Sequence, residues 1–287
     1  MPVTPVTPGT DELTELEQLA IDAATEAGRF ILDERPVQLR VAETKSSATD
    51  VVTVMDQRAE QMLRRRVTAA RPHDAIVGEE GAAKDGESGV TWLIDPIDGT
   101  VNYLYDIPAY CVSVAAVTGD ASTAGGWRPV AAAVCNPSTG EVFHARLGGG
   151  AHVAGGRGVP AQGQPLAVSG VTTLGQTLTG TGFGYLAEVR RRQGAVAAAL
   201  LPDIRDLRRA GSAALDLCAV ASGSLDAYFE SGLNPWDLAA GWLIATEAGA
   251  LVTGLRSAGP AAAMTVAAGP GVHAQLLRRL EELIPAT

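Results

Sequence analysis

The chain has 287 residues, of which 46% are hydrophobic and 19% are charged, a composition that indicates a globular protein and excludes a largely disordered one. Its formal net charge of −10 disfavours general binding to the phosphate backbone of nucleic acids. A small anionic substrate remains compatible with this charge, because bound metal ions reverse its sign locally.

The first part of the chain predicts a disordered Pro- and Thr-rich tail over residues 1–10 and an N-terminal α+β lobe over 11–165. Apolar residues at helical spacing predict a helix over 11–33 and a second helix that starts near Asp56 and ends before Pro72. Short β-like runs follow at 75–77, 92–94, 111–117, 130–134, 142–144 and 151–153. We expect an antiparallel sheet covered by the two helices, with residues 118–128 as a hairpin loop.

The second part predicts a C-terminal α/β lobe over 166–287, because strands and helices alternate along it. The strands are expected at 178–181, 204–207, 225–229, 251–253 and 264–267. The helices are expected at 186–200, 212–221, 235–248 and 271–283. The fold class predicted is therefore mixed α+β and α/β.

The sequence predicts neither a secretory signal in its first residues nor a membrane-spanning helix. No uninterrupted apolar run of the roughly 18 residues that a membrane helix needs occurs, and the N-terminal residues lack the pattern of a secretory signal. The three cysteines, Cys111, Cys135 and Cys218, are widely spaced, which indicates buried thiols rather than disulfides. We expect a cytoplasmic protein without membrane contact.

The most informative segment is residues 92–102, where an apolar strand leads into Asp95 and Asp98. Pro96 and Gly99 predict a tight turn that folds Asp98 back toward Asp95, with the carbonyl of Ile97 between them. Hard oxygen ligands of this kind are those that Mg²⁺ prefers. Taken alone, the segment is equally consistent with a polar turn.

Three further acidic segments have ordinary explanations when each is taken alone. Glu79 and Glu80 follow a short strand, as in many solvated loops. Asp237 lies in the first turn of a helix that Asn234 caps, where it complements the helix dipole or, alternatively, serves as a ligand beside an anion site. Asp56 opens a predicted helix, so capping is its default role.

The four segments together resemble the inositol monophosphatase family. The strongest signatures are residues 95–100 (DPIDGT) and 236–249 (WDLAAGWLIATEAG), and two such motifs in order are specific. The similarity runs from about residue 13 to the C-terminus and is greatest to actinobacterial members. It implies a layered αβαβα sandwich of the sugar-phosphatase type and a lithium-sensitive phosphatase that acts on a small phosphorylated polyol or sugar by in-line attack of a metal-activated water.

The resemblance also implies a metal site with two or three Mg²⁺ ions. Its ligands would be Glu79, Asp95, the carbonyl of Ile97, Asp98 and Asp237, with Asp56 at a third, weaker site. Glu79, Asp95 and Thr100 would be catalytic, and Asp98, Gly99 and Thr100 would contact the phosphate. Elementary electrostatics supports the grouping, because two carboxylates about 5 Å apart repel by about 3 kcal/mol at an effective dielectric constant near 20. Several such pairs require protons or cations.

Substrate selection is expected at other positions. The resemblance implies substrate contacts from Gly211, Ser212, Ala213, Glu230, Asp237 and Lys45. For Glu230 an exposed strand end, and for Lys45 a plain surface lysine, are equally compatible readings. A dinucleotide-binding role for the glycines at 180–184 is excluded, because no acidic residue follows at the required distance.

The leading substrate is inositol 1-phosphate, and the alternatives within the family are histidinol phosphate, fructose 1,6-bisphosphate and a 3′-phosphoadenosine nucleotide. A homodimer is implied by the same resemblance. The alternative of another class is a regulatory protein associated with RNA or transcription, which the acidic charge disfavours as a direct RNA binder.

Overall fold

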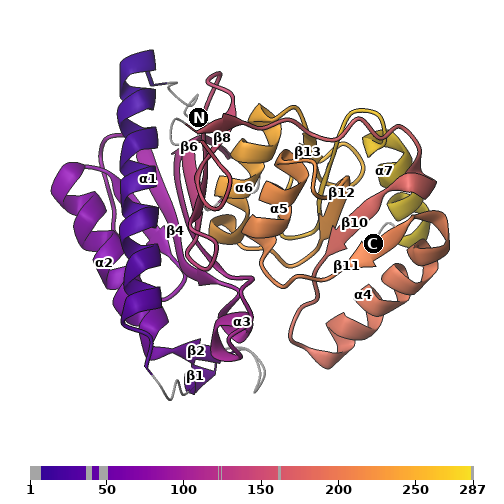
Figure 1. The fold of residues 1–287 in the computed structure, drawn as a ribbon, viewed down its shortest axis with the longest axis horizontal. Helices are drawn as coiled ribbons and strands as arrows, with labels where there is room; N and C mark the ends of the chain where they lie inside the picture. Colours follow the sequence, from indigo (N-terminus) through magenta and orange to yellow (C-terminus); the bar gives the residue numbers. More distant parts are fainter. Residues whose placement is uncertain are drawn as a thin grey trace.

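A computed structural model describes residues 8–36, 41–44, 51–121, 123, 125–160 and 163–285. These residues form five layers in the order helix, sheet, helix, sheet, helix (Figure 1), which confirms the predicted sandwich. The outer layers are α1 (Thr10–Asp33) with α2 (Val54–Ala70), and α4 (Ala187–Leu200) with α7 (His273–Leu283). The middle layer consists of α5 (Ala213–Ala221) and α6 (Pro235–Glu247).

The first sheet has seven strands in sequence order, from β3 to β9. Its strands are β3 (Ala75–Gly78), β4 (Val90–Asp98), β5 (Cys111–Gly119), β6 (Trp127–Asn136), β7 (Glu141–Arg146), β8 (Ala151–Gly155) and β9 (Gln164–Pro165). All neighbours pair antiparallel except β3 and β4, which are parallel. The expectation of a wholly antiparallel sheet was therefore wrong at this edge, whereas the hairpin between β5 and β6 is confirmed.

The second sheet has five strands in the order β11-β10-β12-β14-β13. Its strands are β10 (Leu178–Thr181), β11 (Asp206–Arg208), β12 (Ala227–Glu230), β13 (Leu251–Thr253) and β14 (Thr265–Ala268). The remaining elements, which the sequence did not predict, are β1 (Val41–Thr44), β2 (Val51–Thr53), α3 (Thr100–Leu104) and the 3₁₀ turns η1 (Leu174–Gln176) and η2 (Leu201–Asp203).

Burial on both faces of the first sheet explains the apolar runs of its central strands. Eight of the nine residues of β5 are buried, because α1 and α2 pack on one face and α5 and α6 on the other. Since α5 and α6 come from the second half of the chain, the two predicted lobes share the middle layer. The division of the chain at residues 165 and 166 stays a prediction.

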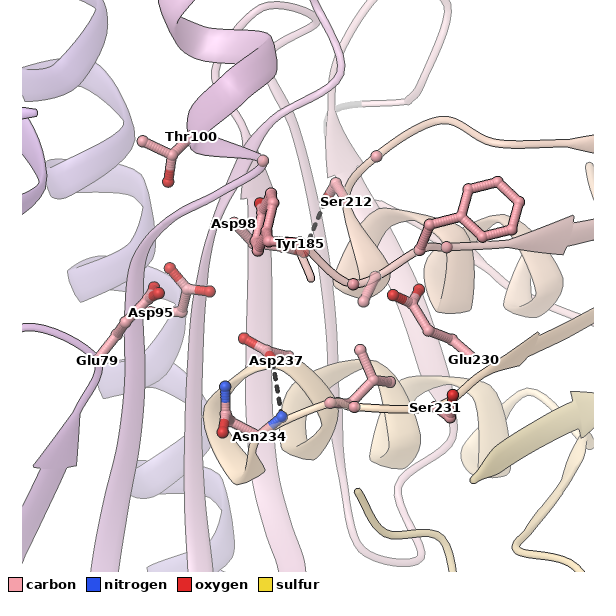
Figure 2. A pocket seen from close by; sticks show the side chains of 18 of the residues that line it. Glu79, Asp95, Asp98, Thr100, Tyr185, Ser212, Glu230, Ser231, Asn234 and Asp237 are labelled. Carbon is pink, nitrogen blue, oxygen red and sulfur yellow. Dashed lines mark hydrogen bonds between the residues drawn. The ribbon is translucent and has the colours of Figure 1, made fainter. Parts of the chain in front are cut away.

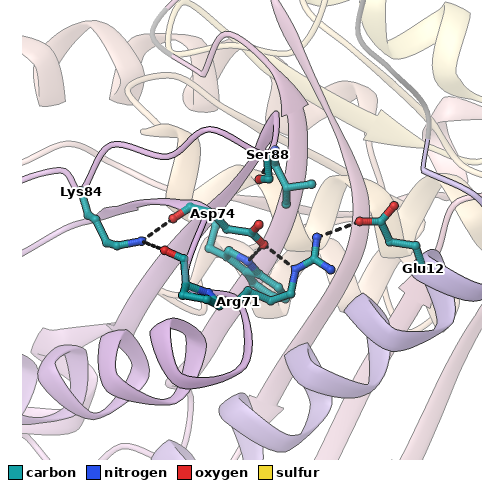
Figure 3. Close-up of polar contacts among 8 residues, drawn as sticks. Glu12, Arg71, Asp74, Lys84 and Ser88 are labelled. Atoms are coloured by element: carbon teal, nitrogen blue, oxygen red, sulfur yellow. Dashed lines mark hydrogen bonds and ion pairs between the residues drawn. The ribbon is translucent and has the colours of Figure 1, made fainter.

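A buried carboxylate joins α1, the end of α2 and the first sheet (Figure 3). Asp74 is 1% exposed, and its Oδ2 accepts hydrogen bonds from Trp92 Nε1 and Arg71 Nε, each at 2.9 Å. Arg71 also donates to Glu12 of α1 at 2.7 Å. Lys84 Nζ donates to the carbonyl of Asp74 at 2.6 Å, so the loop between β3 and β4 is tied to the same point.

Replacement of Asp74 by alanine is expected to lower the free energy of unfolding by about 2–4 kcal/mol, because the buried indole N–H loses its acceptor and Arg71 loses its more buried partner. Urea unfolding followed by tryptophan fluorescence measures this change. The control is Asp206→Ala, which removes an ion pair to Arg208 whose two side chains are each 51% exposed, and which we expect to leave stability nearly unchanged. Equal effects of the two variants would contradict a structural role for Asp74.

Candidate active site

One pocket of about 450 Å³ opens between the two sheets. Among the sequence-predicted site residues, those that line it are Glu79, Asp95, Ile97, Asp98, Gly99, Thr100, Gly211, Ser212, Ala213, Glu230 and Asp237. Asp56 lies directly behind this lining, where it accepts a hydrogen bond from Thr100. Lys45 lies outside the described residues.

A bulge in β4 brings Asp95 and Asp98 to the same face of the sheet. In a regular strand, residues three apart point to opposite faces. Here Asp95 pairs with Ser113 and Asp98 with Cys111, so three steps on β4 match two on β5. The expected tight turn is instead a bulge within the strand, because β4 continues to Asp98. The bulge contains Pro96, which lacks a backbone donor for the ladder, and Ile97, whose N–H donates to Asp95 Oδ1 at 2.9 Å.

The carboxylate of Asp98 lies at the N-terminus of α5. Its Oδ2 accepts hydrogen bonds from the hydroxyl of Ser212 and the backbone N–H of Ala214, each at 2.7 Å. Burial nonetheless raises the pKa of Asp98 above its usual value, against the lowering effect of these donors. The first turn of α5 thus fixes one carboxyl oxygen of Asp98 and leaves the other available to the pocket.

Asp237 occupies the corresponding place on α6. Asn234 precedes the helix, Pro235 is its first residue, and the backbone N–H of Asn234 donates to Asp237 Oδ2 at 2.7 Å (Figure 2). The sequence-based placement of Asp237 in the first turn is confirmed.

The carboxylates converge from separate elements. Figure 2 shows Glu79 and Asp95 beside each other, with Asp98 and Asp237 turned toward the same end of the pocket. Burial raises the pKa of Asp95 well above its usual value, and the charges of Glu79, Asp98 and Asp237 raise it further. The pKa of Asp237 is also raised well above normal, by burial and then by Glu79 and Asp98. The site therefore disfavours full ionisation of its own acids.

Asp56 lies behind these carboxylates, where it contacts Thr100 of the pocket lining. Asp56 is fully buried in the first turn of α2, which begins at Val54 and therefore near Asp56, as expected. Thr53 and Asp56 form a capping box, which confirms the capping role expected of Asp56. The hydroxyl of Thr100 lies 3.2 Å from Asp56 Oδ1 and 3.1 Å from the carbonyl oxygen of Ile97. Burial raises the pKa of Asp56 to about 6.

The donor set fits a hard divalent cation. Four carboxylates and Ile97 line one pocket, and burial, followed by the mutual repulsion of the acids, raises the pKa values of Asp95 and Asp237. Among the described residues, no three His, Cys, Asp or Glu side chains are grouped so that they could hold one metal ion as they stand. Mg²⁺ does not require such a group, because it is usually held by one or two carboxylates with water and substrate phosphate.

The opposite end of the pocket carries a second acidic group. Glu230 ends β12 and faces the carboxylates (Figure 2); its Oε2 accepts the hydroxyl proton of Tyr228 at 2.6 Å. Burial raises its pKa to about 7. Glu230 is therefore a partly buried pocket residue and not an exposed strand end.

Some lining residues were not identified from the sequence. Residues 182–186, which follow β10, line the pocket together with Arg209. The sequence offers no support for a dinucleotide-binding loop here. The position of this segment directly after a strand was nevertheless a sign that it contributes to a site. The buried Asp216 of α5, which does not line this pocket, was also not singled out from the sequence. Burial raises its pKa to about 8, and the charges of Glu230 and Asp98 act in the same direction.

The comparisons with known proteins agree on one family. A family model described as "Inositol monophosphatase family" matches residues 12–285. An inositol-1-monophosphatase of Mycobacterium leprae is 45% identical over 283 residues, which cover 93% of this chain and 94% of the relative. The solved structure of Mycobacterium tuberculosis SuhB is 42% identical, with a TM-score of 0.75, and the match covers 94% of this chain and 97% of that one.

A more distant relative carries a different name. The "Nus factor SuhB" of Vibrio cholerae is 35% identical over 237 residues, which cover 82% of this chain and 83% of the relative. No helix of the described residues is long and apolar enough to span a membrane.

The raised pKa of Asp216 makes stability depend on pH. Because burial raises this pKa from the ordinary 3.8 to about 8 in the folded protein, the native state holds a proton that the unfolded chain releases between these values. Stability therefore falls as pH rises through this window, by up to about 1.4 kcal/mol per pH unit for one full proton. We expect Asp216→Asn to flatten this dependence between pH 5 and 8 in urea unfolding. Parallel pH profiles of the two proteins would show that Asp216 ionises normally.

Proposed function

Because the chain belongs to the inositol monophosphatase family, which makes it a phosphoric monoester hydrolase, we propose that it hydrolyses a small phosphorylated polyol, with inositol 1-phosphate as the first candidate. The observation that carries the proposal is the convergence of four carboxylates in one pocket, with Glu230 opposite them. The family depends on metal ions, generally Mg²⁺.

We assign the metal ligands to the acidic end of the pocket. Glu79, Asp95, Asp98, Asp237 and the carbonyl of Ile97 would hold two Mg²⁺ ions, and Asp56 would take part in a third site. When bound, Mg²⁺ supplies positive charge that polarises the phosphoryl group and favours ionisation of water. Phosphoryl transfer needs little more than positioning and charge stabilisation, which suits this donor set.

The protein's own groups position the reactants. Glu79 and Thr100 would orient the attacking water, because both line the pocket beside Asp95. The backbone N–H groups of Gly99 and Thr100 would hold phosphate oxygens. Gly99 has a φ of 96°, a left-handed conformation that glycine adopts without strain, and an added Cβ would lie 2.9 Å from the carbonyl oxygen of Ala109.

Substrate selection is proposed at the opposite end of the pocket. Glu230 would accept hydrogen bonds from two neighbouring hydroxyls of the polyol, with Ser212 and Ala213 beside it. Histidinol phosphate, fructose 1,6-bisphosphate and 3′-phosphoadenosine nucleotides are the alternative substrates. A dimer, as the family resemblance implies, is also a proposal.

A regulatory role in transcription is the second candidate, because relatives such as the Vibrio cholerae protein are named Nus factors. The net charge of −10 favours a protein partner over direct RNA contact. Binding to RNA that weakens steeply with rising salt would reverse this preference.

Asp95→Asn and Asp237→Asn are expected to lower kcat/KM for inositol 1-phosphate by at least about 100-fold, since loss of even an outer partner of a metal ligand typically costs 10- to 100-fold. Both variants should stay folded, because each removes a charge that its neighbours repel. Phosphate release and circular dichroism measure the two properties, with Asp206→Asn as the surface control. Near-normal rates in both site variants would end the metal-site proposal.

Glu230→Gln is expected to raise KM for inositol 1-phosphate by roughly 10-fold, because one hydrogen bond to a charged acceptor contributes about 1.5–3 kcal/mol. p-Nitrophenyl phosphate, which has no hydroxyls to bind, serves as the matched substrate, and its KM should change little. A panel with the alternative substrates completes the assay. If histidinol phosphate is hydrolysed and inositol 1-phosphate is not, the leading substrate is wrong.

A further inference from the structure

Two residues of α2 that lie outside the pocket lining form hydrogen bonds with the loop that carries Glu79. Glu60 is 2% exposed, and its Oε2 accepts the backbone N–H of Glu80 at 2.7 Å. Its Oε1 accepts from Arg64 Nε at 2.8 Å, one turn later on the same helix. Arg64 in turn donates to the carbonyl of Gly81 at 3.2 Å.

These contacts fix the chain on both sides of Glu79. On one side, Gly78 pairs with Ile94 in the parallel ladder of β3 and β4, immediately before Asp95. On the other side, the Glu60–Arg64 pair holds Glu80 and Gly81. Farther along, Lys84 returns to Ile76 through two backbone hydrogen bonds of 2.8 and 2.9 Å. Glu79 therefore lies between two fixed points of the backbone, the end of β3 and the segment held by the Glu60–Arg64 ion pair.

The two glycines around the glutamates make room for this arrangement. A Cβ at Gly78 would lie 2.6 Å from the Glu60 carboxylate, and one at Gly81 would lie 2.7 Å from its Oε1. Gly81 does not have the left-handed φ that would require glycine for backbone reasons. Its small size therefore serves the close approach of Glu60 and Arg64 to the loop.

We propose that Glu60 and Arg64 are positioning residues, which hold the 78–81 loop so that Glu79 faces Asp95 in the pocket. The buried charge of Glu60 is neutralised by Arg64, and its remaining acceptor capacity is used on a backbone amide of the loop. Partners of this kind hold a metal-binding side chain in place before the metal binds, so that less conformational entropy is lost on metal binding. The inference rests on the proposed role of Glu79 as a metal ligand.

The test measures Mn²⁺ binding to metal-free protein by isothermal titration calorimetry, together with kcat and KM for inositol 1-phosphate. Glu60→Ala is expected to raise the Mn²⁺ dissociation constant roughly 10- to 100-fold. Glu60→Gln should lose less, because its amide oxygen still accepts from Glu80. The matched control is Arg66→Ala, on the same helix, whose ion pair to Asp22 lies away from the loop and whose loss should leave Mn²⁺ binding unchanged.

A double-mutant cycle separates this role from a general structural one. Gly81→Ala alone should weaken Mn²⁺ binding, because its Cβ displaces Glu60 and Arg64. In a Glu60→Ala protein the Glu60 carboxylate no longer occupies this space, so Gly81→Ala should cause little further loss of Mn²⁺ affinity. Fully additive effects, or wild-type affinity in folded Glu60→Gln and Gly81→Ala, would overturn the proposal even if Glu60→Ala fails to fold. If the wild type itself neither binds Mn²⁺ nor hydrolyses phosphate esters, the proposed function fails instead.

Discussion

The chemistry of the pocket depends on the repulsion among the carboxylates that the fold brings together there. Burial and neighbouring charge raise the pKa values of Asp95 and Asp237, so these acids by themselves favour bound protons. The carboxylates stay close together despite their repulsion because the backbone holds them in place. Asp95 and Asp98 lie on a β-bulge, and Asp237 lies in the first turn of a helix. The same repulsion supports the proposal that divalent cations bind in this pocket.

The pocket is built from residues of three of the five layers. The first sheet supplies Asp95 and Asp98, the middle helices supply Ser212 and Asp237, and the second sheet supplies Glu230. The acids proposed to bind metal and the acid proposed to bind substrate therefore come from different layers. Under this proposal, a change at Glu230 on the second sheet would alter substrate binding without moving the acids of the first sheet.

The sequence predicted the larger elements well because their periodicity is local. The strands at 178–181 and 251–253 match the structure, and Asn234-Pro235 marked the start of α6. The sequence could not show α3, which has five residues and follows a left-handed Gly99, because it is too short for a periodic pattern. It also could not show the bulge in β4, which depends on pairing with β5.

The site was predictable in membership and not in geometry. The residues around DPIDGT and WDLAAG do line one pocket, but the contact of Asp98 with Ser212 joins positions 114 apart in the chain, and only the tertiary fold creates it. Asp216 and Glu60 were missed for the same reason: a single acid on a helix carries no local sign of burial.

The most direct test of the account is phosphate release from inositol 1-phosphate before chelation, after exhaustive chelation and after return of Mg²⁺. The account predicts that activity disappears with the metal and returns with it, while the chelated protein stays folded. Equal rates in the chelated and untreated protein would contradict the claim that cations complete this pocket.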